Sequence, residues 1–159
     1  MSTAPDQVYA VLVQVLADTL LIPNLAVADV VPRIGLQSVR GSPQWFDGVL
    51  NWQGRKVPVA RFEVLNGAPA SAQPGRRARV LILNATGSRI PSGVFGILTE
   101  SHPHLVTLNR VALQSAALRD GDRADLVVAR ARIANQEAAI PNFDRLENEL
   151  AGVLDSQGS

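Results

Sequence analysis

The sequence GSPQWFDGVLNWQGRKVPVARFEVL at residues 41–65 predicts a β-hairpin near the centre of the chain. A β-rich run at residues 49–52 is followed by a tight turn, QGR at residues 53–55, and by a second β-rich run at residues 56–62. Two such runs joined by a turn that contains glycine are a strong hairpin signal. Both tryptophans of the chain lie in this stretch. Because each can bury a large apolar area, we expect the hairpin to be a centre of packing.

Short β-rich runs recur along the rest of the chain, and they predict further strands at residues 8–16, 19–22, 80–83, 94–99, 104–108 and 126–133. Residues 25–31 (LAVADVV) are compatible with either a helical turn or a strand. Residues 109–121 suggest a helical turn through Leu113, Ala116 and Ala117. Many short strands with few charges predict a mainly β protein built as two small barrels or as a sandwich.

Two segments outside the strands indicate how the chain is organised. Residues 68–79 (APASAQPGRRAR) are rich in Pro, Ala and Gly, and they predict a surface connection and a boundary between two halves. Residues 142–154 predict a helix, the clearest in the chain. Asp144 and Glu147 there match a capping box, and leucines recur every four residues from Leu146. This apolar stripe can pack on the body of the domain or dock on a partner.

Composition excludes several classes of function. The 159 residues are 47% hydrophobic, and Lys+Arg 15 against Asp+Glu 14 gives a net charge of +1, so no overall charge favours nucleic acid or an anionic membrane. The chain has no cysteine, which excludes disulfides and thiolate chemistry. Its apolar runs are too short to cross a bilayer, and residues 1–7 lack the basic start of a secretory signal. We therefore expect an intracellular protein that does not insert into membranes.

The sequence offers little for catalysis. The pattern formed by Glu100, His102 and His104 could hold a metal on one face of a strand, and a small metal-dependent enzyme is the remote alternative. Pro103 interrupts this run, and no fourth ligand is evident. Neither a phosphate-binding glycine loop nor a nucleophile elbow occurs. The sequence therefore predicts a binding protein, with no enzymatic activity, cofactor or metal.

The central stretch also resembles a known family. Residues 43–54 (PQWFDGVLNWQG), followed by Val-Pro-Val at residues 57–59, resemble the CheW-like adaptor domain of bacterial chemotaxis. Residues 8–30 resemble the opening strands of that family, and residues 79–83 and 94–98 resemble its later strand pair. The likeness runs from about residue 8 to 133, which leaves residues 134–159 as a C-terminal extension.

This resemblance implies a fold and a role. The fold would be two five-stranded SH3-like barrels that share a core. The role would be a cytoplasmic, non-enzymatic scaffold at membrane-associated receptor arrays. Such scaffolds couple the cytoplasmic tip of a chemoreceptor to the regulatory domain of a CheA-type histidine kinase. The kinase is part of a two-component signalling system. Carried over by position, the expected partner-binding residues are Val27, Asp29, Asn51, Trp52, Gln53, Gly54, Val57 and Pro58.

Three positions depart from the family pattern. Gln53 stands where the family has arginine, Arg61 where it often has aspartate, and Asp29 where it has glutamate. Gln cannot replace the charge of a guanidinium group. The departures indicate a divergent adaptor, and the alternative role is a scaffold of a type IV pilus (twitching) system that binds receptors or other adaptors without normal kinase coupling. Asp29 itself is either a solvated edge residue or a carboxylate offered to a partner.

Overall fold

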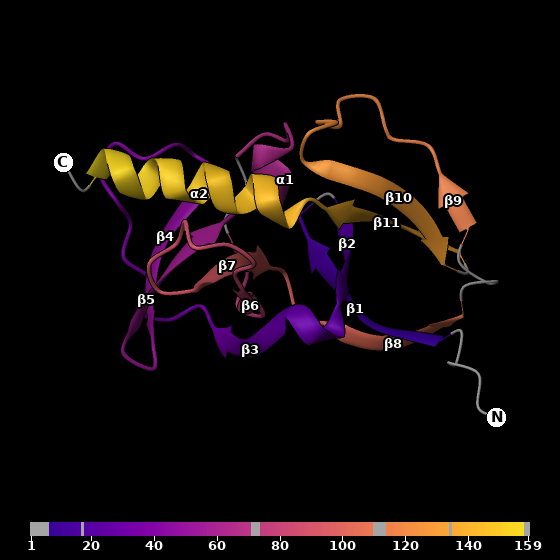
Figure 1. Cartoon of the computed structure of the whole chain (residues 1–159), viewed down its shortest axis with the longest axis horizontal. Coiled ribbons are helices and arrows are strands. Elements are labelled where there is room, and N and C mark those ends of the chain that lie inside the picture. The colour runs from indigo at the N-terminus through magenta and orange to yellow at the C-terminus, as the bar shows by residue number, and fades with distance from the viewer. Residues whose placement is uncertain (1–6, 17, 71–73, 110–113, 134, 158–159) are drawn as a thin grey trace.

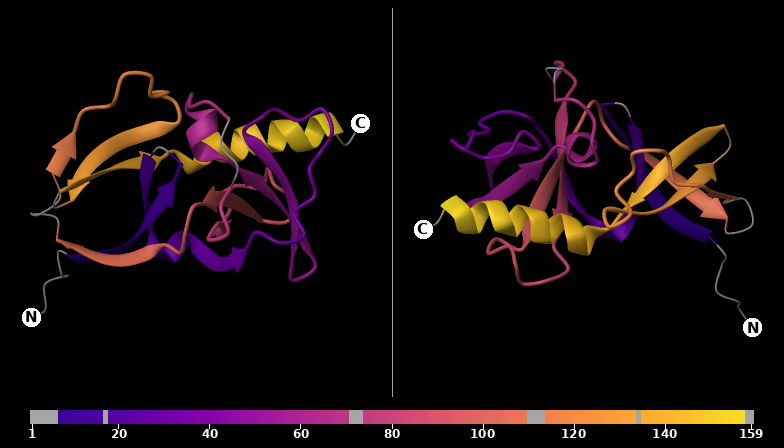
Figure 2. Two further views of the ribbon diagram at one scale, coloured as in Figure 1. Left: turned by 180° about the vertical axis from the view of Figure 1, so that it is seen from behind. Right: turned by 90° about the horizontal axis from the view of Figure 1, so that it is seen from above.

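The computed structural model describes residues 7–16, 18–70, 74–109, 114–133 and 135–157. Within these ranges two curled β-sheets lie side by side, and a long helix runs along one of them (Figure 1). The two further views in Figure 2 show the same arrangement from behind and from above. The prediction of a mainly β protein with a C-terminal helix is therefore confirmed.

The first sheet contains six strands in the order β8-β1-β2-β11-β10-β9. Their bounds are β1 Gln7–Val15, β2 Asp18–Pro23, β8 His104–Asn109, β9 Gln114–Ala116, β10 Val127–Ile133 and β11 Gln136–Pro141. Neighbours are antiparallel except β2 and β11, which are parallel. The expected helical turn through Ala116 is wrong, because that residue pairs with Arg130 as part of β9; Leu113 lies outside the described residues.

The second sheet contains five strands in the order β3-β6-β7-β5-β4. Their bounds are β3 Val27–Pro32, β4 Phe46–Trp52, β5 Arg55–Ala60, β6 Arg79–Asn84 and β7 Val94–Thr99. The ambiguous run at 25–31 divides between a 3-10 turn, η1 Asn24–Ala26, and β3. The second hairpin strand ends at Ala60, earlier than predicted, because a short helix, α1 Phe62–Leu65, begins two residues later.

The main hydrophobic core lies between the sheets and under α2, which spans Phe143–Gln157. Leu146, Leu150 and Val153 of this helix are buried against residues of both sheets. The apolar stripe of the helix therefore packs on the domain itself. The helix begins differently from the prediction: Asn142 caps it by accepting a hydrogen bond from the Arg145 N–H at 3.2 Å.

Glu147, expected in a capping box, anchors α2 to the β6–β7 loop instead. Its side chain is fully buried, and it accepts hydrogen bonds from the Thr86 N–H (2.8 Å), the Thr86 hydroxyl (2.9 Å) and the Gly87 N–H (3.1 Å). Asp144, the other residue of the expected box, is exposed and bonds to Arg89 of the same loop at 2.7 Å. The two carboxylates therefore fix the orientation of the helix on the five-stranded sheet.

A buried arginine joins the six-stranded sheet to α1. Arg130 of β10 is 1% exposed and donates two hydrogen bonds each to Asp18 and Asp122, at 2.8–3.0 Å. Asn66, directly after α1, donates to Asp122 at 3.0 Å and accepts from the Arg123 N–H at 2.8 Å. Hydrogen bonds from Arg130, in the first place, hold the pKa of Asp122 well below its usual range. The network ties the two halves of the fold together through charged groups.

Candidate partner-binding surface

The predicted hairpin is present, and its turn has the geometry that the sequence suggested. β4 and β5 pair in antiparallel register up to Trp52 opposite Arg55. Gln53 and Gly54 at the turn have φ angles of 50° and 76°. Two consecutive residues with positive φ are typical of the type I′ turn that matches the twist of paired strands. The turn leaves Asn51, Gln53 and Gly54 exposed at the surface.

Trp52 and Asp29, 23 residues apart in sequence, meet at the base of this turn. The indole N–H of Trp52 donates to one carboxylate oxygen of Asp29 at 2.8 Å, and the other oxygen accepts from the Val30 N–H at 2.8 Å. Trp52 lies on β4 and Asp29 on β3, the two opposite edges of the five-stranded sheet. The bond therefore closes the curl of that sheet. Asp29 is half-buried, and both of its carboxylate oxygens accept hydrogen bonds from the protein.

A cation lies against the indole ring. The Arg55 guanidinium lies 5.8 Å from the centroid of the Trp52 ring, a cation–π contact. Lys56, the next residue, is also exposed. It borders a surface hollow of about 420 Å³ lined by Gly35, Gln37, Ser38, Val39, Val49, Asn51 and Lys56. The hairpin tip is thus polar and positively charged, with one half-buried tryptophan beneath it.

Val27 occupies the first position of β3, next to an irregularity of the sheet. A β-bulge lies between Val27 and Asp29, so the intervening Ala28 is exposed. Val27 is half-buried and packs against the main core, while Leu25, two residues earlier, is 94% exposed. These residues present an apolar strip beside Asp29. A contact there is compatible with the role that the resemblance implies for Val27.

Val57 and Pro58 do not belong to this surface. Both are buried, and Val57 is fully enclosed in the second core cluster of the five-stranded sheet. Val57 and Pro58 are both buried because other elements cover both faces of β5. The strand is therefore buried without alternation from Val57 to Ala60. They support the hairpin from within and cannot touch a partner. The expected set therefore reduces to Val27, Asp29 and the four residues Asn51–Gly54.

Arg61, one of the departures from the family pattern, has a structural partner. Its Nε lies 3.1 Å from a carboxylate oxygen of Asp47, whose side chain is buried. Arg33 binds the same carboxylate through two hydrogen bonds of 2.9 Å, and these bonds raise the pKa of Arg33. One buried aspartate thus holds two arginines beside the start of β4. The charge at Arg61 serves this clamp.

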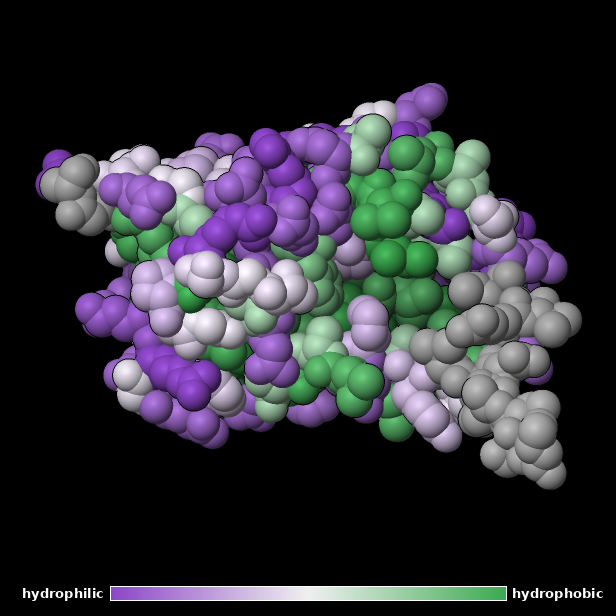
Figure 3. Space-filling model, in the orientation of Figure 1, coloured by the Kyte–Doolittle hydropathy of each residue, from purple (hydrophilic) through white to green (hydrophobic). Residues whose placement is uncertain are grey.

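A second apolar area lies on the six-stranded sheet, and the sequence patterns do not indicate it. Figure 3 shows apolar residues gathered over β10, β11 and β2. Val128 is 61% exposed on β10, and Leu105 is exposed on the edge strand β8. Val128 is exposed because a bulge between Val127 and Ala129 shifts the alternation of β10. Simple alternation along residues 126–133 could not reveal this change of face.

The histidine pattern does not form a metal site. Glu100, His102 and His104 are all exposed. Within the described residues, no three His, Cys, Asp or Glu side chains come together in a way that could hold a metal ion. Over the same part of the chain, no helix combines the length and the apolar character needed to span a bilayer.

Comparisons with known proteins agree with this architecture. The crystal structure of the scaffolding protein TtCheW from Thermoanaerobacter tengcongensis matches with a TM-score of 0.72 at 13% sequence identity, over 89% of this chain and 87% of that one. At this identity the match shows the fold, two SH3-like barrels. No curated protein matches the sequence. The model of the CheW-like domain matches residues 10–151, including β11 and most of α2, and the chain therefore belongs to the CheW-like domain family.

Proposed function

We propose that this protein is a non-enzymatic adaptor that couples a chemoreceptor to a CheA-type histidine kinase in the cytoplasm. The observation that carries the proposal is the family match over residues 10–151. The scaffolding protein from Thermoanaerobacter tengcongensis, which has the same fold, adds support. The two partners bind to different parts of one rigid body, and the kinase is thereby held at the receptor array.

The receptor-facing surface in this proposal is the strip around Val27 beside the hairpin tip. Leu25 and Val27 supply apolar area, and burial of such groups drives most protein association. Asp29 and Trp52 hold the strip and the tip in a fixed relation through their 2.8 Å hydrogen bond. The exposed Arg55 and Lys56 form a cationic rim, which favours a partner with acidic residues around an apolar centre.

A divergent role in a type IV pilus system is the second candidate. It is favoured by Gln53, which gives the exposed turn an uncharged amide where the family has arginine. An amide offers no charge to an acidic group on a kinase, so kinase coupling would be weak while receptor binding persists. This candidate and the first differ in one measurable property, the affinity for the regulatory domain of the kinase.

The test measures binding of the purified protein to two partners, a receptor cytoplasmic fragment and the kinase regulatory domain. Val27→Arg should weaken receptor binding roughly 30-fold or more, because an arginine buried in an apolar contact without a partner costs at least about 2 kcal/mol. Val128→Arg on the six-stranded sheet is the matched control and should bind normally. Since Val27 also packs on the core, Ala28→Arg at the neighbouring exposed position tests the same surface without disturbing the fold.

The results separate the candidates. Binding of both partners supports the coupling role, and binding of the receptor alone supports the pilus-type role. If folded wild-type protein binds neither partner, the adaptor proposal fails. If Val27→Arg and Ala28→Arg bind the receptor as well as wild type does, the proposed surface is wrong.

A further inference from the structure

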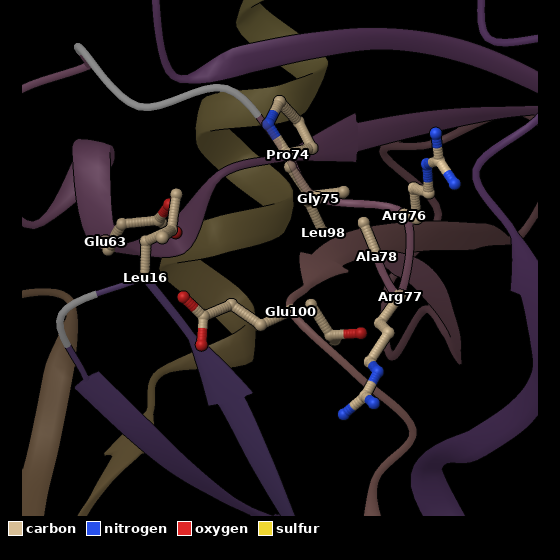
Figure 4. A pocket seen from close by; sticks show the side chains of 10 residues that line it. Leu16, Glu63, Pro74, Gly75, Arg76, Arg77, Ala78, Leu98 and Glu100 are labelled. Carbon is tan, nitrogen blue, oxygen red and sulfur yellow. The ribbon is translucent and has the colours of Figure 1, made fainter.

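A cavity of about 350 Å³ lies away from the hairpin tip, between α1, the segment 74–78 and the end of β7. Leu16, Ala78 and Leu98 form its apolar walls, as Figure 4 shows. Its size is at the lower end of the range for pockets that bind small ligands or single side chains. The cavity contains no part of the surface assigned to the receptor.

Glu63 of α1 is a buried acid on the wall of this cavity. The residue is 5% exposed, and its Oε1 has no hydrogen-bond partner among the described residues. Burial raises its pKa to about 6, against the opposing effects of its own backbone N–H and of Arg61. A buried carboxylate with an unused oxygen is costly, and each such group in a folded protein needs an explanation. A ligand that donates hydrogen bonds would supply the missing partner.

A second carboxylate lies near the first. Figure 4 shows Glu100, at the end of β7, with its carboxylate on the same side of the cavity as Glu63. The Glu100 charge adds to the rise in the pKa of Glu63, as does that of Asp47. Neither Glu63 nor Glu100 forms an ion pair with a described residue of this chain. Two unpaired carboxylates beside apolar walls favour a cation.

The arginines of the cavity do not neutralise these acids. Arg76 and Arg77 line the opposite wall and are exposed. Figure 4 shows the Arg76 guanidinium pointing away from Glu63 and Glu100, and the Arg77 guanidinium directed downward, apart from both carboxylates. Their heads remain hydrated, as is usual for long basic side chains. The buried charge of the cavity is therefore negative.

The charged groups on the far side of Glu63 are already paired. A second cavity of about 230 Å³ shares Glu63 and is lined by Asp18, Asp122 and Arg130, among others. Arg130 is fully engaged with the two aspartates, and Arg119 lies 3.6 Å from Asp18. Arg61, whose charge opposes the rise in the pKa of Glu63, binds Asp47, and none of the described cations that line the second cavity forms an ion pair with Glu63. The first cavity is thus the side from which a counter-charge can come.

We propose that the cavity between α1, residues 74–78 and the end of β7 binds an alkylguanidinium or alkylammonium group. Glu63 accepts hydrogen bonds from the cationic head at the buried end, and Glu100 adds a second negative charge at the exposed end. The alkyl stem lies against Leu16, Ala78 and Leu98. Such a group is carried by free amines and by the arginine or lysine side chains of proteins. The inference does not depend on the adaptor role.

The test titrates the full chain with two probes at pH 7.5. Binding is monitored through the amide chemical shifts in NMR spectra. Agmatine represents a free amine, and the peptide acetyl-Gly-Arg-Gly-amide represents a protein side chain. Butylurea and the citrulline form of the peptide are the neutral controls. We expect both cationic probes to shift the amides of Glu63, Ala78 and Glu100, and the neutral controls to shift none of them.

Two variants locate the binding. Glu63→Gln keeps the shape of the side chain and should lower affinity about tenfold or more, the usual effect of losing a charged hydrogen bond. Asp155→Asn, an exposed carboxylate on α2, is the matched control and should leave affinity unchanged. Lowering the pH from 7.5 to 5.0 should weaken binding to wild type about tenfold, since Glu63 is then mostly protonated. The pH change should have little effect on Glu63→Gln.

The outcomes decide the inference. Binding of agmatine alone identifies a free amine as the ligand, and binding of both probes shows that a protein side chain can also enter. If neither probe shifts the cavity amides, or if the neutral controls bind equally, the inference is overturned. Unchanged affinity in folded Glu63→Gln would also overturn it.

Discussion

Replacing Arg130 with methionine should destabilise the fold more than any change at the partner-binding surface. The methionine keeps part of the apolar stem of arginine but removes its four hydrogen bonds to Asp18 and Asp122. Both aspartate side chains are buried. After the substitution, two carboxylates remain in a poorly solvated place without their main counter-charge.

The size of the expected loss of stability depends on the contacts that each carboxylate retains. Asp18 retains a hydrogen bond from the Thr19 N–H at 2.8 Å and Arg119 at 3.6 Å. Asp122 retains hydrogen bonds from Asn66 and from the Arg119 N–H. Breaking a buried pair usually costs about 3–5 kcal/mol, so these remaining contacts place the expected loss near the lower end, about 3 kcal/mol. For a chain of this size that corresponds to a fall in Tm of roughly 6–12 °C.

Thermal and urea unfolding, followed by circular dichroism at pH 7, measure this loss. The triple variant Arg130→Met, Asp18→Asn, Asp122→Asn should recover a large part of it, because no buried charge is then left unpaired. The difference between wild type and Arg130→Met should narrow as the pH falls below about 4. Arg130 holds the pKa of Asp122 low in the folded protein, and the stability gained from that ion pair is lost on acidification. A loss below about 1 kcal/mol at pH 7 would refute the reasoning, since it would mean that the network is hydrated.

Three further predictions concern single residues. Gly48→Ala should cost about 2 kcal/mol or more in urea unfolding, because its φ is 142° and a Cβ there would lie 2.5 Å from the Gln37 carbonyl oxygen; a neutral result would contradict this packing. Glu63→Gln should raise the free energy of unfolding by about 1–2 kcal/mol at pH 7.5 and little at pH 4. The folded pKa of Glu63 is raised to about 6, so wild type loses stability as the pH rises from about 4.5 to 6; an equal effect at both pH values would exclude this cause. Glu147→Gln should lower the free energy of unfolding by about 2 kcal/mol, since an amide cannot replace the charged acceptor of Thr86 and Gly87; unchanged melting of the variant would show that α2 needs no such anchor.

The hairpin could be predicted because its signal is local. Gln53 and Gly54 set the turn, and the residues on either side have strand propensity, so the presence of both strands follows from neighbours in sequence. The start of β4 at Phe46, three residues earlier than predicted, lies beyond a register shift between Phe46 and Gly48 that the local pattern does not show. The same holds for the long helix, whose leucines repeat at helical spacing. Motif likeness around this hairpin was also enough to indicate the family.

Elements that depend on distant partners could not be predicted. β11 shows little alternation, because its central residues Ala138 and Ala139 point to opposite faces of the sheet and each is buried in a different hydrophobic cluster. The helix α1 has four residues, too few for any period to appear. Arg130 is buried beside two aspartates, and one of them, Asp18, lies 112 residues away. Likewise, nothing local joins Trp52 to Asp29.

The boundary near residues 68–79 and the partner-binding role of Val27, Asp29 and the turn stay predictions. The fold adds constraints to them. Burial removes Val57 and Pro58 from the set of possible contacts. The bond between Asp29 and Trp52 makes the strand edge and the hairpin tip a single rigid unit.

The position of β11 between β2 and β10 bears on how the protein acquires its structure. β1 and β2 are synthesised first, but the edge of β2 has no partner strand until β11 is made. β11 begins more than 110 residues after the end of β2. α2 then supplies Leu146 and Leu150 to a core that was open until that point. Contacts between such distant segments slow folding, because a long loop must close before any pairing is gained. During synthesis, the edge of β2 therefore lacks its native partner strand and can pair with strands of other chains.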